Sequence, residues 1–276
     1  MIDIHCHVLP GLDDGPRSFE DALALIQEAR TAGITQLVAT PHSSTDRSSP
    51  RPEQIHAVLE QLNHMARARG ISLPVLPGAE IMLDPDVGRF IDDGLLLPIG
   101  DARRYVLVEF PITCIPKYAY DALFDIVARG YVPVIAHPER YFAICEDPER
   151  LAAFIRSGAL TQVDVGSLIG VYGSSACRCA ARIIEHSMCH FIATDAHTAG
   201  FYEGVVTAAL GRMEEQFGPD LLETLTVKNP QAALLGLDIE VPDPIPWPAE
   251  RKESSLLGGW MARLKVPGMR KDPGRD

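Results

Sequence analysis

Two histidines one residue apart, His5 and His7, end the first apolar run of the chain. In a β-strand, residues i and i+2 lie on the same face, so both imidazoles would point one way and Cys6 the other. Paired imidazoles at a strand end supply half of a divalent-metal site. A single pair with this spacing also occurs among packed or surface histidines. Further candidate ligands elsewhere in the chain are therefore needed to distinguish a metal site from ordinary histidines.

Most of the later strand-like runs end in side chains of the same kinds. Together with the first run and the segment after it, they provide five histidines and four carboxylates as candidate metal ligands: His5, His7, Asp14, His42, Glu80, Glu109, His137, Asp195 and His197. Sites of parallel α/β folds form at the carboxyl ends of the strands, so these side chains would converge on one mouth. Each one alone is equally well explained as a solvated loop residue or a helix cap. Burying all of them without cations would be very costly, so we interpret them as ligands of divalent metal ions.

The number and type of these ligands indicate the chemistry. They are too many for one ion and enough for two or three if carboxylates bridge. Histidine mixed with carboxylate, without cysteine, suits manganese, iron or zinc. Three divalent ions would contribute six positive charges against four negative charges from the carboxylates, and the surplus suits a bridging hydroxide and an anionic substrate. The pattern therefore predicts hydrolysis of a phosphate ester.

Arg140 follows His137 by three residues and would lie on the loop above this mouth. Its guanidinium can form paired hydrogen bonds with phosphate oxygens, although the alternative is an ordinary surface arginine. Arg17 and Arg47 are weaker candidates for the same role. We expect Arg140, together with Asp14 and His42, to act directly in catalysis.

The six cysteines argue against a thiol-based phosphatase. The residue six positions after each cysteine is never arginine, so the C-x5-R phosphate loop is absent from the sequence. The cysteines form no C-x-x-C pair either. We expect them to be reduced thiols of a cytoplasmic protein, most of them filling the core.

Strands and helices that alternate along the chain must position these residues. Seven apolar runs of strand length occupy residues 2–7, 36–42, 73–80, 105–110, 132–137, 160–165 and 189–197. Segments with helical periodicity lie between and after them, at residues 18–32, 52–69, 118–129, 148–156, 176–185 and 202–217. Ser18 with Asp21 predicts a helix N-terminus, and glycines at 33, 70, 130 and 158 predict helix ends.

The repeated strand–helix order predicts an α/β fold with a parallel sheet. The runs are almost continuously hydrophobic, as expected for strands that are buried on both faces. Seven such units in one domain favour a closed or nearly closed barrel, and an open doubly wound sheet is the alternative.

Composition sets the limits of the fold and of the possible partners. The chain has 276 residues, of which 46% are hydrophobic, enough for one large core. We expect a catalytic domain over residues 1–240 and a Pro-rich, then basic and amphipathic tail over residues 241–276. The net charge of −12 argues against nucleic acid as a partner. The sequence shows neither a signal peptide nor a membrane span, so at most the tail would contact a membrane peripherally.

At the candidate ligands the sequence resembles the polymerase-and-histidinol-phosphatase (PHP) superfamily. Within it, the sequence is most similar to the manganese-dependent protein-tyrosine phosphatases of bacterial capsule and exopolysaccharide loci. The matching motifs lie at residues 1–7, 12–16, 39–42, 78–81, 134–141, 162–170 and 194–197. The first of them and His137-Pro138-Glu139-Arg140 are the most diagnostic.

The resemblance implies a distorted, seven-stranded, TIM-like (β/α) barrel with three divalent ions, usually manganese. Iron or zinc would also fit the ligands. The three implied ligand sets share Glu80 between the first two: His5, His7, Glu80 and Asp195; Glu80, Glu109 and His137; and Asp14, His42 and His197. Arg140 would hold the phosphate of the substrate.

The resemblance also implies a substrate, the phosphotyrosine-rich tail of a membrane-associated bacterial tyrosine kinase that controls polysaccharide export. Two alternatives stay open. One is a small-molecule phosphatase, for example one that acts on histidinol phosphate, and the other is a metal-binding regulator without turnover.

The chain departs from the family pattern at two places. Ser43 stands where many members have a second histidine, and residues 198–203 lack an arginine that many members carry after the Asp-Ala-His motif. The candidate metal ligands are all present, so we expect hydrolysis to be retained. The missing arginine instead affects the expected binding and specificity for the substrate.

Overall fold

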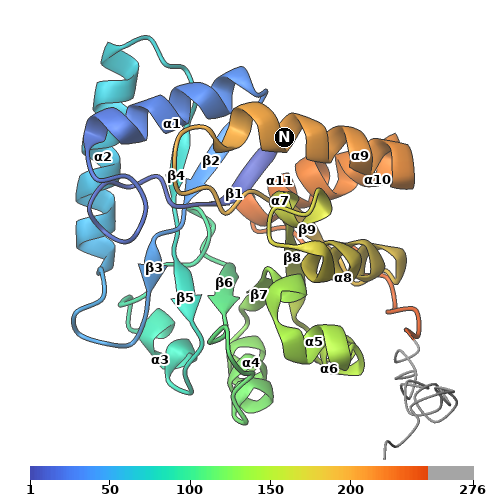
Figure 1. Ribbon diagram of the computed structural model, residues 1–276. Coiled ribbons are helices and arrows are strands. Elements are labelled where there is room, and N and C mark those ends of the chain that lie inside the picture. The colour runs from blue at the N-terminus through green and yellow to red at the C-terminus, as the bar shows by residue number, and fades with distance from the viewer. Residues whose placement is uncertain (248–276) are drawn as a thin grey trace, which may run out of the picture.

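The strand-length runs form β-strands, and every pairing between them is parallel. The computed structural model describes residues 1–247 and shows an α/β fold with two parallel sheets (Figure 1). The first sheet has the order β1 (Ile2–Cys6), β2 (Gln36–Ala39) and β4 (Val75–Pro77). The second has the order β3 (His42–Ser43), β5 (Glu80–Met82), β6 (Tyr105–Glu109), β7 (Val132–Ala136), β8 (Leu160–Asp164) and β9 (Phe191–Ala193).

Two of the seven runs are each broken into two strands. Pro41, which has no backbone N–H to donate, lies between β2 and β3. Gly78 lies between β4 and β5, where an added Cβ would come within 2.8 Å of Val38 Cγ1. The first part of each run pairs in the first sheet and the second part in the other sheet. The breaks therefore lead two runs from one sheet into the other.

The two sheets are also joined between the first and the last strand. The Asp195 N–H donates to the His5 carbonyl and the His7 N–H donates to the Ala196 carbonyl, each over 2.9 Å. These hydrogen bonds place the segment after β9 beside the end of β1. The residues at 5–7 and 195–197 are thus neighbours in space.

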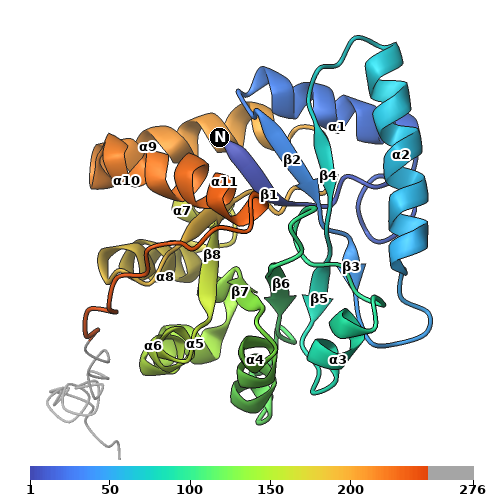
Figure 2. The same cartoon turned by 180° about the vertical axis from the view of Figure 1, so that it is seen from behind.

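Helices lie around the outside of the strands (Figures 1 and 2). The six expected segments correspond to α1 (Phe19–Thr31), α2 (Pro52–Ala68), α4 (Ala119–Ala128), α6 (Glu149–Arg156), α8 (Ser174–Glu185) and the π-helical η2 (Tyr202–Val206) followed by α9 (Thr207–Phe217). Ser18 caps α1 as predicted, because its hydroxyl accepts the Asp21 N–H. The short elements are α3 (Val87–Asp92), η1 (Pro138–Arg140), α5 (Phe142–Glu146), α7 (Val165–Leu168), α10 (Pro219–Glu223), η3 (Thr224–Lys228) and α11 (Asn229–Leu234).

Both faces of the strands are buried, as the continuous hydrophobic runs predict. In β6, Val106 and Val108 belong to the larger apolar cluster, which includes the inner faces of the helices. Tyr105 and Leu107 belong to a second cluster, together with Ile4 of β1 and residues of β7, β8 and β9. This second cluster contains strand residues from both sheets, so the two sheets share an apolar core.

The cysteines correct one expectation. Cys145 of α5 and Cys179 of α8 form a disulfide, so the prediction of six reduced thiols is wrong for this pair. Their Cα atoms lie 5.7 Å apart because α5 and α8 pack together, which a separation of 34 residues along the chain does not reveal. The other four cysteines are free.

The C-terminal region is described in part. Residues 241–247 have no regular secondary structure, and the predicted basic, amphipathic part of the tail lies outside the described residues. Within residues 1–247, none of the helices combines the length and apolar character that crossing a membrane requires.

Candidate metal centre

The two histidines of the opening motif point at the same place. The Nε2 atoms of His5 and His7 lie 3.2 Å apart, and both side chains are fully buried. The opposite ring nitrogens face acceptors: His5 Nδ1 lies 2.7 Å from Gln162 Oε1, and His7 Nδ1 lies 2.7 Å from Asp13 Oδ2. An Nδ1–H that donates to such an acceptor leaves the Nε2 lone pair free. Both rings are thus set to present Nε2 as a ligand.

Glu80 and Asp195 complete the first group of candidate ligands. Asp195 Oδ1 lies 3.1 Å from His5 Nε2 and 3.2 Å from His7 Nε2. The two oxygens of Glu80 lie 3.3 Å from the same two nitrogens, one oxygen on each. All four side chains are buried, and their ligand atoms lie within 4.8 Å of one another. Such a set has the size and composition of a divalent-metal site.

Glu80 also belongs to a second group, with His42 and Glu109. His42 Nδ1 lies 3.0 Å from Glu80 Oε2 and 3.0 Å from Glu109 Oε1. His137 Nε2 approaches Glu80 from another side, 3.0 Å from Oε1. The family resemblance pairs Glu80 and Glu109 with His137, whereas the structure places the His42 ring between these two carboxylates.

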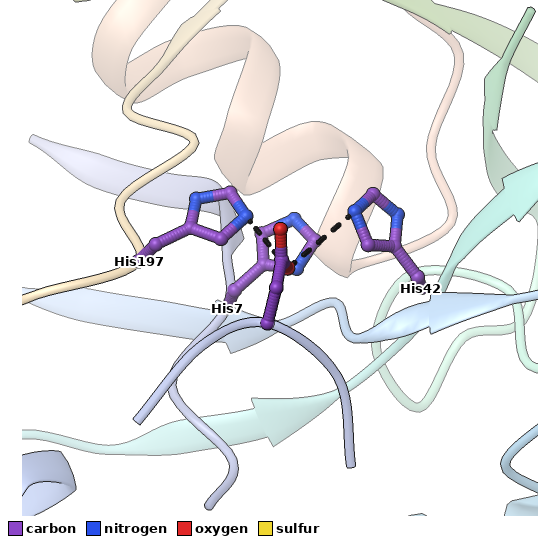
Figure 3. A group of neighbouring side chains, drawn as sticks. His7, His42 and His197 are labelled. Atoms are coloured by element: carbon purple, nitrogen blue, oxygen red, sulfur yellow. Dashed lines mark ion pairs between the residues drawn. The ribbon is translucent and has the colours of Figure 1, made fainter. Parts of the chain in front are cut away.

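The third group consists of His7, Asp14, His42 and His197. Figure 3 shows the three histidine rings, which come from three different segments, facing a common point. His197 Nε2 lies 3.1 Å from Asp14 Oδ1, and His42 Nε2 lies 3.7 Å from the same oxygen. His197 Nδ1 faces the Asp195 carbonyl at 2.8 Å, which again leaves Nε2 as the free lone pair. This group is the most open of the three, since the Asp14 side chain is 68% exposed.

The nine candidates from the sequence thus lie together at one end of the strands. Two of them have an unusual backbone: His137 has φ 34° and Asp195 has φ 52°, in the left-handed region that favours glycine. Each such residue costs on the order of 1–3 kcal/mol, and strain of this kind concentrates at functional sites. The turns after β7 and β9 are therefore shaped to aim these two side chains at the cluster.

Unsatisfied polar atoms test whether metal ions fit the cluster. Among residues 1–247, His42 Nδ1, Glu80 Oε2 and Asp195 Oδ1 are buried without a hydrogen-bond partner. The first two of these atoms lie only 3.0 Å apart, without the geometry of a hydrogen bond. Leaving buried polar atoms unpaired costs about 1–3 kcal/mol each. A shared cation would satisfy them, so the residues present fit divalent metal ions.

The electrostatics of the cluster agree with this fit. Burial alone would lower the pKa of His5, yet Glu80 and Asp195 hold that pKa well above its usual value. Burial would likewise raise the pKa of Glu80, but His5, with His137 and His42, holds it well below its usual value. His42 is affected in the same way, and its pKa is raised to about 10 by Glu109 and Glu80 against the effect of burial. Protons and divalent cations compete for such lone pairs.

Arg140 lies at the edge of the cluster, at the end of η1. Its Nη1 is 2.6 Å from Asp195 Oδ2 and 3.9 Å from Asp164 Oδ2. Its guanidinium also stacks 4.5 Å from the centre of the Tyr172 ring. The arginine is thus anchored beside a candidate ligand, as its place above the mouth predicts. Arg47, by contrast, is exposed on the loop after β3.

The sequence analysis missed the residues that support the candidate ligands. Asp13 and Gln162 orient His7 and His5, and Asp164 lies behind Arg140. Glu139 is buried and accepts hydrogen bonds from the Asp164 N–H and the Ser167 hydroxyl. The run at residues 160–165 ends in Val165 rather than in histidine, aspartate or glutamate, so its last residue does not predict a ligand. Gln162 and Asp164 are nevertheless spaced by two residues on one face of β8, and this spacing is the signal that would have found them.

Cys6 is not part of the cluster. Its Sγ lies 3.5 Å from the Ala196 carbonyl and 3.4 Å from the Tyr202 hydroxyl, on the side of β1 opposite to His5 and His7. Burial raises the pKa of the Cys6 thiol well above its usual value. A neutral, buried thiol is a poor nucleophile, in agreement with the absence of a cysteine phosphate loop.

A pocket of about 440 Å³ opens beside the third group. Its walls are the loop after β1 with the start of α1, and the loop after β9. The residues that line it are Asp14, Gly15, Pro16, Arg17, Asp21, Ala24, His197, Thr198 and Ala199. Two candidate ligands thus form part of a pocket that has the size of a small-ligand site.

A parallel α/β fold with a cluster of histidines and carboxylates at its strand ends defines the class of metal-dependent hydrolases. Within this class, the chain belongs to the family described as capsular polysaccharide synthesis, CpsB/CapC, whose family model matches residues 1–235.

Named relatives agree with this assignment. The chain is 37% identical over 226 residues to the tyrosine-protein phosphatase YwqE of Bacillus subtilis, covering 82% of this chain and 89% of the relative. It is 35% identical over 198 residues to the putative tyrosine-protein phosphatase CapC of Staphylococcus aureus, covering 72% and 77%. The tyrosine-protein phosphatase CpsB of Streptococcus agalactiae is 27% identical over 239 residues, covering 85% and 98%.

Solved structures also resemble the chain. One comes from the crystal structures of YwqE from Bacillus subtilis and CpsB from Streptococcus pneumoniae, which are described as unique metal-dependent tyrosine phosphatases. It matches with a TM-score of 0.85 and 35% identity, covering 90% of this chain and 100% of the other. The histidinol phosphate phosphatase of Lactococcus lactis matches with a TM-score of 0.51 and 13% identity, over 78% and 92%, which is a likeness of fold alone.

Proposed function

We propose that this protein is a metal-dependent phosphatase that removes phosphate from phosphotyrosine in proteins. The observation that supports this most strongly is the convergence of nine histidine and carboxylate side chains beside the guanidinium of Arg140. Membership of the CpsB/CapC family, with relatives named tyrosine-protein phosphatases, agrees with this proposal.

Three divalent ions would be held by three sets of ligands. The first set is His5, His7, Glu80 and Asp195; the second is Glu80 and Glu109 with His137 and the Nδ1 side of His42; and the third is Asp14, His197 and the Nε2 side of His42. Manganese is the metal that the resemblance implies, and iron or zinc suits the same donors. Divalent ions at such a site lower the pKa of water and neutralise the charge of the phosphoryl group.

The side chains of the protein would divide the remaining work between them. Arg140 would bind the phosphoryl oxygens, held in place by Tyr172 and by the carboxylates of Asp195 and Asp164. Asp13 and Gln162 would keep the His7 and His5 rings in the tautomer that binds metal.

The side chains of Asp14 and His42 are 68% and 40% exposed to solvent. The ligands of the first group, such as His5 and Asp195, are almost fully buried. We therefore assign Asp14 and His42 to the side of the site that the substrate reaches, in keeping with their expected part in catalysis.

The fold, the domain boundary and the biological setting extend the proposal. The two sheets would together form the seven positions of a distorted, TIM-like barrel, with the catalytic domain over residues 1–240. The substrate would be a bacterial tyrosine autokinase of capsule or exopolysaccharide synthesis, dephosphorylated in the cytoplasm, and the tail would at most touch the membrane surface.

A comparison of substrates tests the proposal. The protein with manganese should hydrolyse a phosphotyrosine peptide faster than histidinol phosphate, lose this activity on chelation, and regain it when manganese is restored. Higher turnover on histidinol phosphate would favour the small-molecule alternative. Bound metal without turnover on either substrate would favour a metal-binding regulator.

Arg140→Ala separates binding of the substrate from binding of the metals. We expect this variant to keep its metal content and to lose roughly a hundredfold in kcat/KM on the phosphotyrosine peptide, the order of magnitude for removing one anion-stabilising donor. His137→Ala should instead lose metal and activity together. If Arg140→Ala matched the wild type, the assigned role of Arg140 would be wrong.

A further inference from the structure

The pocket beside the third group of ligands has a feature that the proposed function leaves unexplained. Arg17 lies in its wall, three residues after Asp14, and is exposed. Among the described residues that line this pocket, it is the only lysine or arginine.

Arg17 differs from its charged neighbours in having no partner. Asp21 accepts a hydrogen bond of 2.8 Å from the Ser18 hydroxyl, and Asp14 faces His197 at 3.1 Å. Within residues 1–247, Arg17 takes part in no hydrogen bond and no ion pair. Its guanidinium is therefore available to a ligand in the pocket.

The opposite wall of the pocket contributes no cation. It consists of His197, Thr198 and Ala199 from the loop after β9, and residues 198–203 contain no arginine or lysine. Pro16 and Ala24 add apolar surface. The carboxylates of Asp14 and Asp21 also line the pocket, but they face His197 and Ser18. Small apolar surfaces beside one unpaired guanidinium suit an aromatic ring that has an anionic group near Arg17.

We infer that Arg17 recognises a second anionic group of the substrate, a carboxylate or a phosphate close to the phosphotyrosine in the peptide. This inference rests on the proposed phosphatase function. The phosphate of the tyrosine would lie at the metal centre beside Asp14 and His197, and its ring would extend into the pocket. Arg17 would then face the residues that flank the tyrosine.

The charge of the whole protein makes such a contact selective. The chain has a net charge of −12, so acidic segments of a substrate are repelled over long range. A local guanidinium reverses this effect for peptides that place an anion at the pocket. Because Arg17 is exposed, the attraction is modest and is weakened by salt.

Three peptides of equal length test the inference. Each contains one phosphotyrosine, and they differ only in the flanking residue, which is glutamine, glutamate or phosphoserine. The KM of each is measured with the manganese-loaded wild type and with Arg17→Gln and Arg17→Glu. Arg30→Glu is the matched control, since Arg30 is an exposed residue of α1 and does not line the pocket.

The wild type and Arg30→Glu should have a KM roughly two- to fivefold lower for the two anionic peptides than for the glutamine peptide. Arg17→Gln should abolish this difference, and Arg17→Glu should reverse it. The wild-type preference should also shrink as salt is raised. A preference for the phosphoserine peptide alone would identify phosphate as the recognised group, and a preference for both would identify negative charge in general.

The ratio of the KM for the glutamine peptide to the KM for the anionic peptides could also be the same in Arg17→Glu as in the wild type. That result would overturn the inference while leaving the phosphatase function intact. A wild type that discriminates none of the peptides would do the same. A metal-loaded wild type that hydrolyses none of the three would instead refute the proposed function, and the inference would fall with it.

Discussion

At the scale of single residues, the candidate metal centre depends on side chains that orient the ligands without being ligands themselves. Gln162 and Asp13 each accept a hydrogen bond from an Nδ1–H, which leaves the Nε2 atoms of His5 and His7 pointing at one place. Asp13 also accepts hydrogen bonds from the backbone N–H groups of Gly15 and His42. One buried carboxylate thus positions both a ligand and the backbone around it.

Asp13→Asn should weaken metal binding without removing a ligand. The amide oxygen still accepts a hydrogen bond, but the negative charge that favours the His7 Nδ1–H is lost, so we expect an affinity for manganese lower by about tenfold. Titration of the metal-free protein by calorimetry measures the effect. Asp101→Ala, an exposed aspartate remote from the candidate ligands in the sequence, is the control. An unchanged affinity in Asp13→Asn would contradict the supporting role of Asp13.

At the scale of elements, β8 links the site to the core. Gln162 lies in the middle of this strand and Asp164 at its carboxyl end, whereas Thr161 hydrogen-bonds to the buried His190 just before β9. Burial lowers the pKa of His190 to about 4. In the unfolded chain the residue would titrate near its ordinary value of about 6.5. Between these values the unfolded state binds more protons, so stability falls as the pH falls.

His190→Asn should remove this pH dependence. Relative to pH 7, the wild type should lose about 2 kcal/mol of unfolding free energy at pH 5 through His190, and the variant should lose correspondingly less. Denaturant titrations at the two pH values give the difference. His64→Asn on the exposed face of α2 should behave like the wild type. Equal losses in the wild type and His190→Asn would refute the buried neutral state of His190.

The disulfide acts at the same scale, because it joins α5 to α8. Helix α5 begins two residues after Arg140, and α8 begins two residues after Tyr172, which stacks on that arginine. The disulfide therefore ties together the two segments that hold Arg140.

Reduction should destabilise the protein. Releasing a loop of 34 residues removes at most about 4 kcal/mol of unfolding free energy in the chain-entropy treatment. Denaturation midpoints with and without a reductant, compared with the double variant Cys145→Ala and Cys179→Ala, measure this loss. Cys114→Ala, which removes an exposed free thiol, should keep the response to reductant. Identical midpoints in oxidised and reduced protein would contradict a stabilising bridge.

At the scale of the whole molecule, the candidate ligands come from both sheets. His5 belongs to β1 of the first sheet and His7 follows it, whereas Glu80 and Glu109 belong to β5 and β6 of the second. Asp195 follows β9 and is hydrogen-bonded through its backbone to β1. Ions bound between these residues would connect the two sheets.

Metal binding should therefore stabilise the entire fold. An ion that binds only the folded state adds about 2.7 kcal/mol when it is present at about 100 times its dissociation constant. The melting temperature should rise with manganese concentration and fall on chelation. Glu80→Gln, which weakens a ligand shared by two groups, should show a much smaller rise. A melting temperature that is independent of manganese in the wild type would refute this link between the sheets.

The sequence by itself determined the kinds of chemistry and the local elements. Residue type at the strand ends indicated metal ligands, the helical and strand periods located the main elements, and the absence of C-x5-R excluded a cysteine nucleophile. These signals are local, because each depends on residues that are close together in the chain.

Only the tertiary structure decided which side chains share a site. His5 and Gln162 are 157 residues apart, and Asp13 meets His42 across 29 residues, so no local pattern reveals either contact. The Cys145–Cys179 disulfide and the position of His42 between Glu80 and Glu109 have the same origin. They follow from how strands and helices pack, which depends on the shapes of distant segments rather than on the spacing of residues within one.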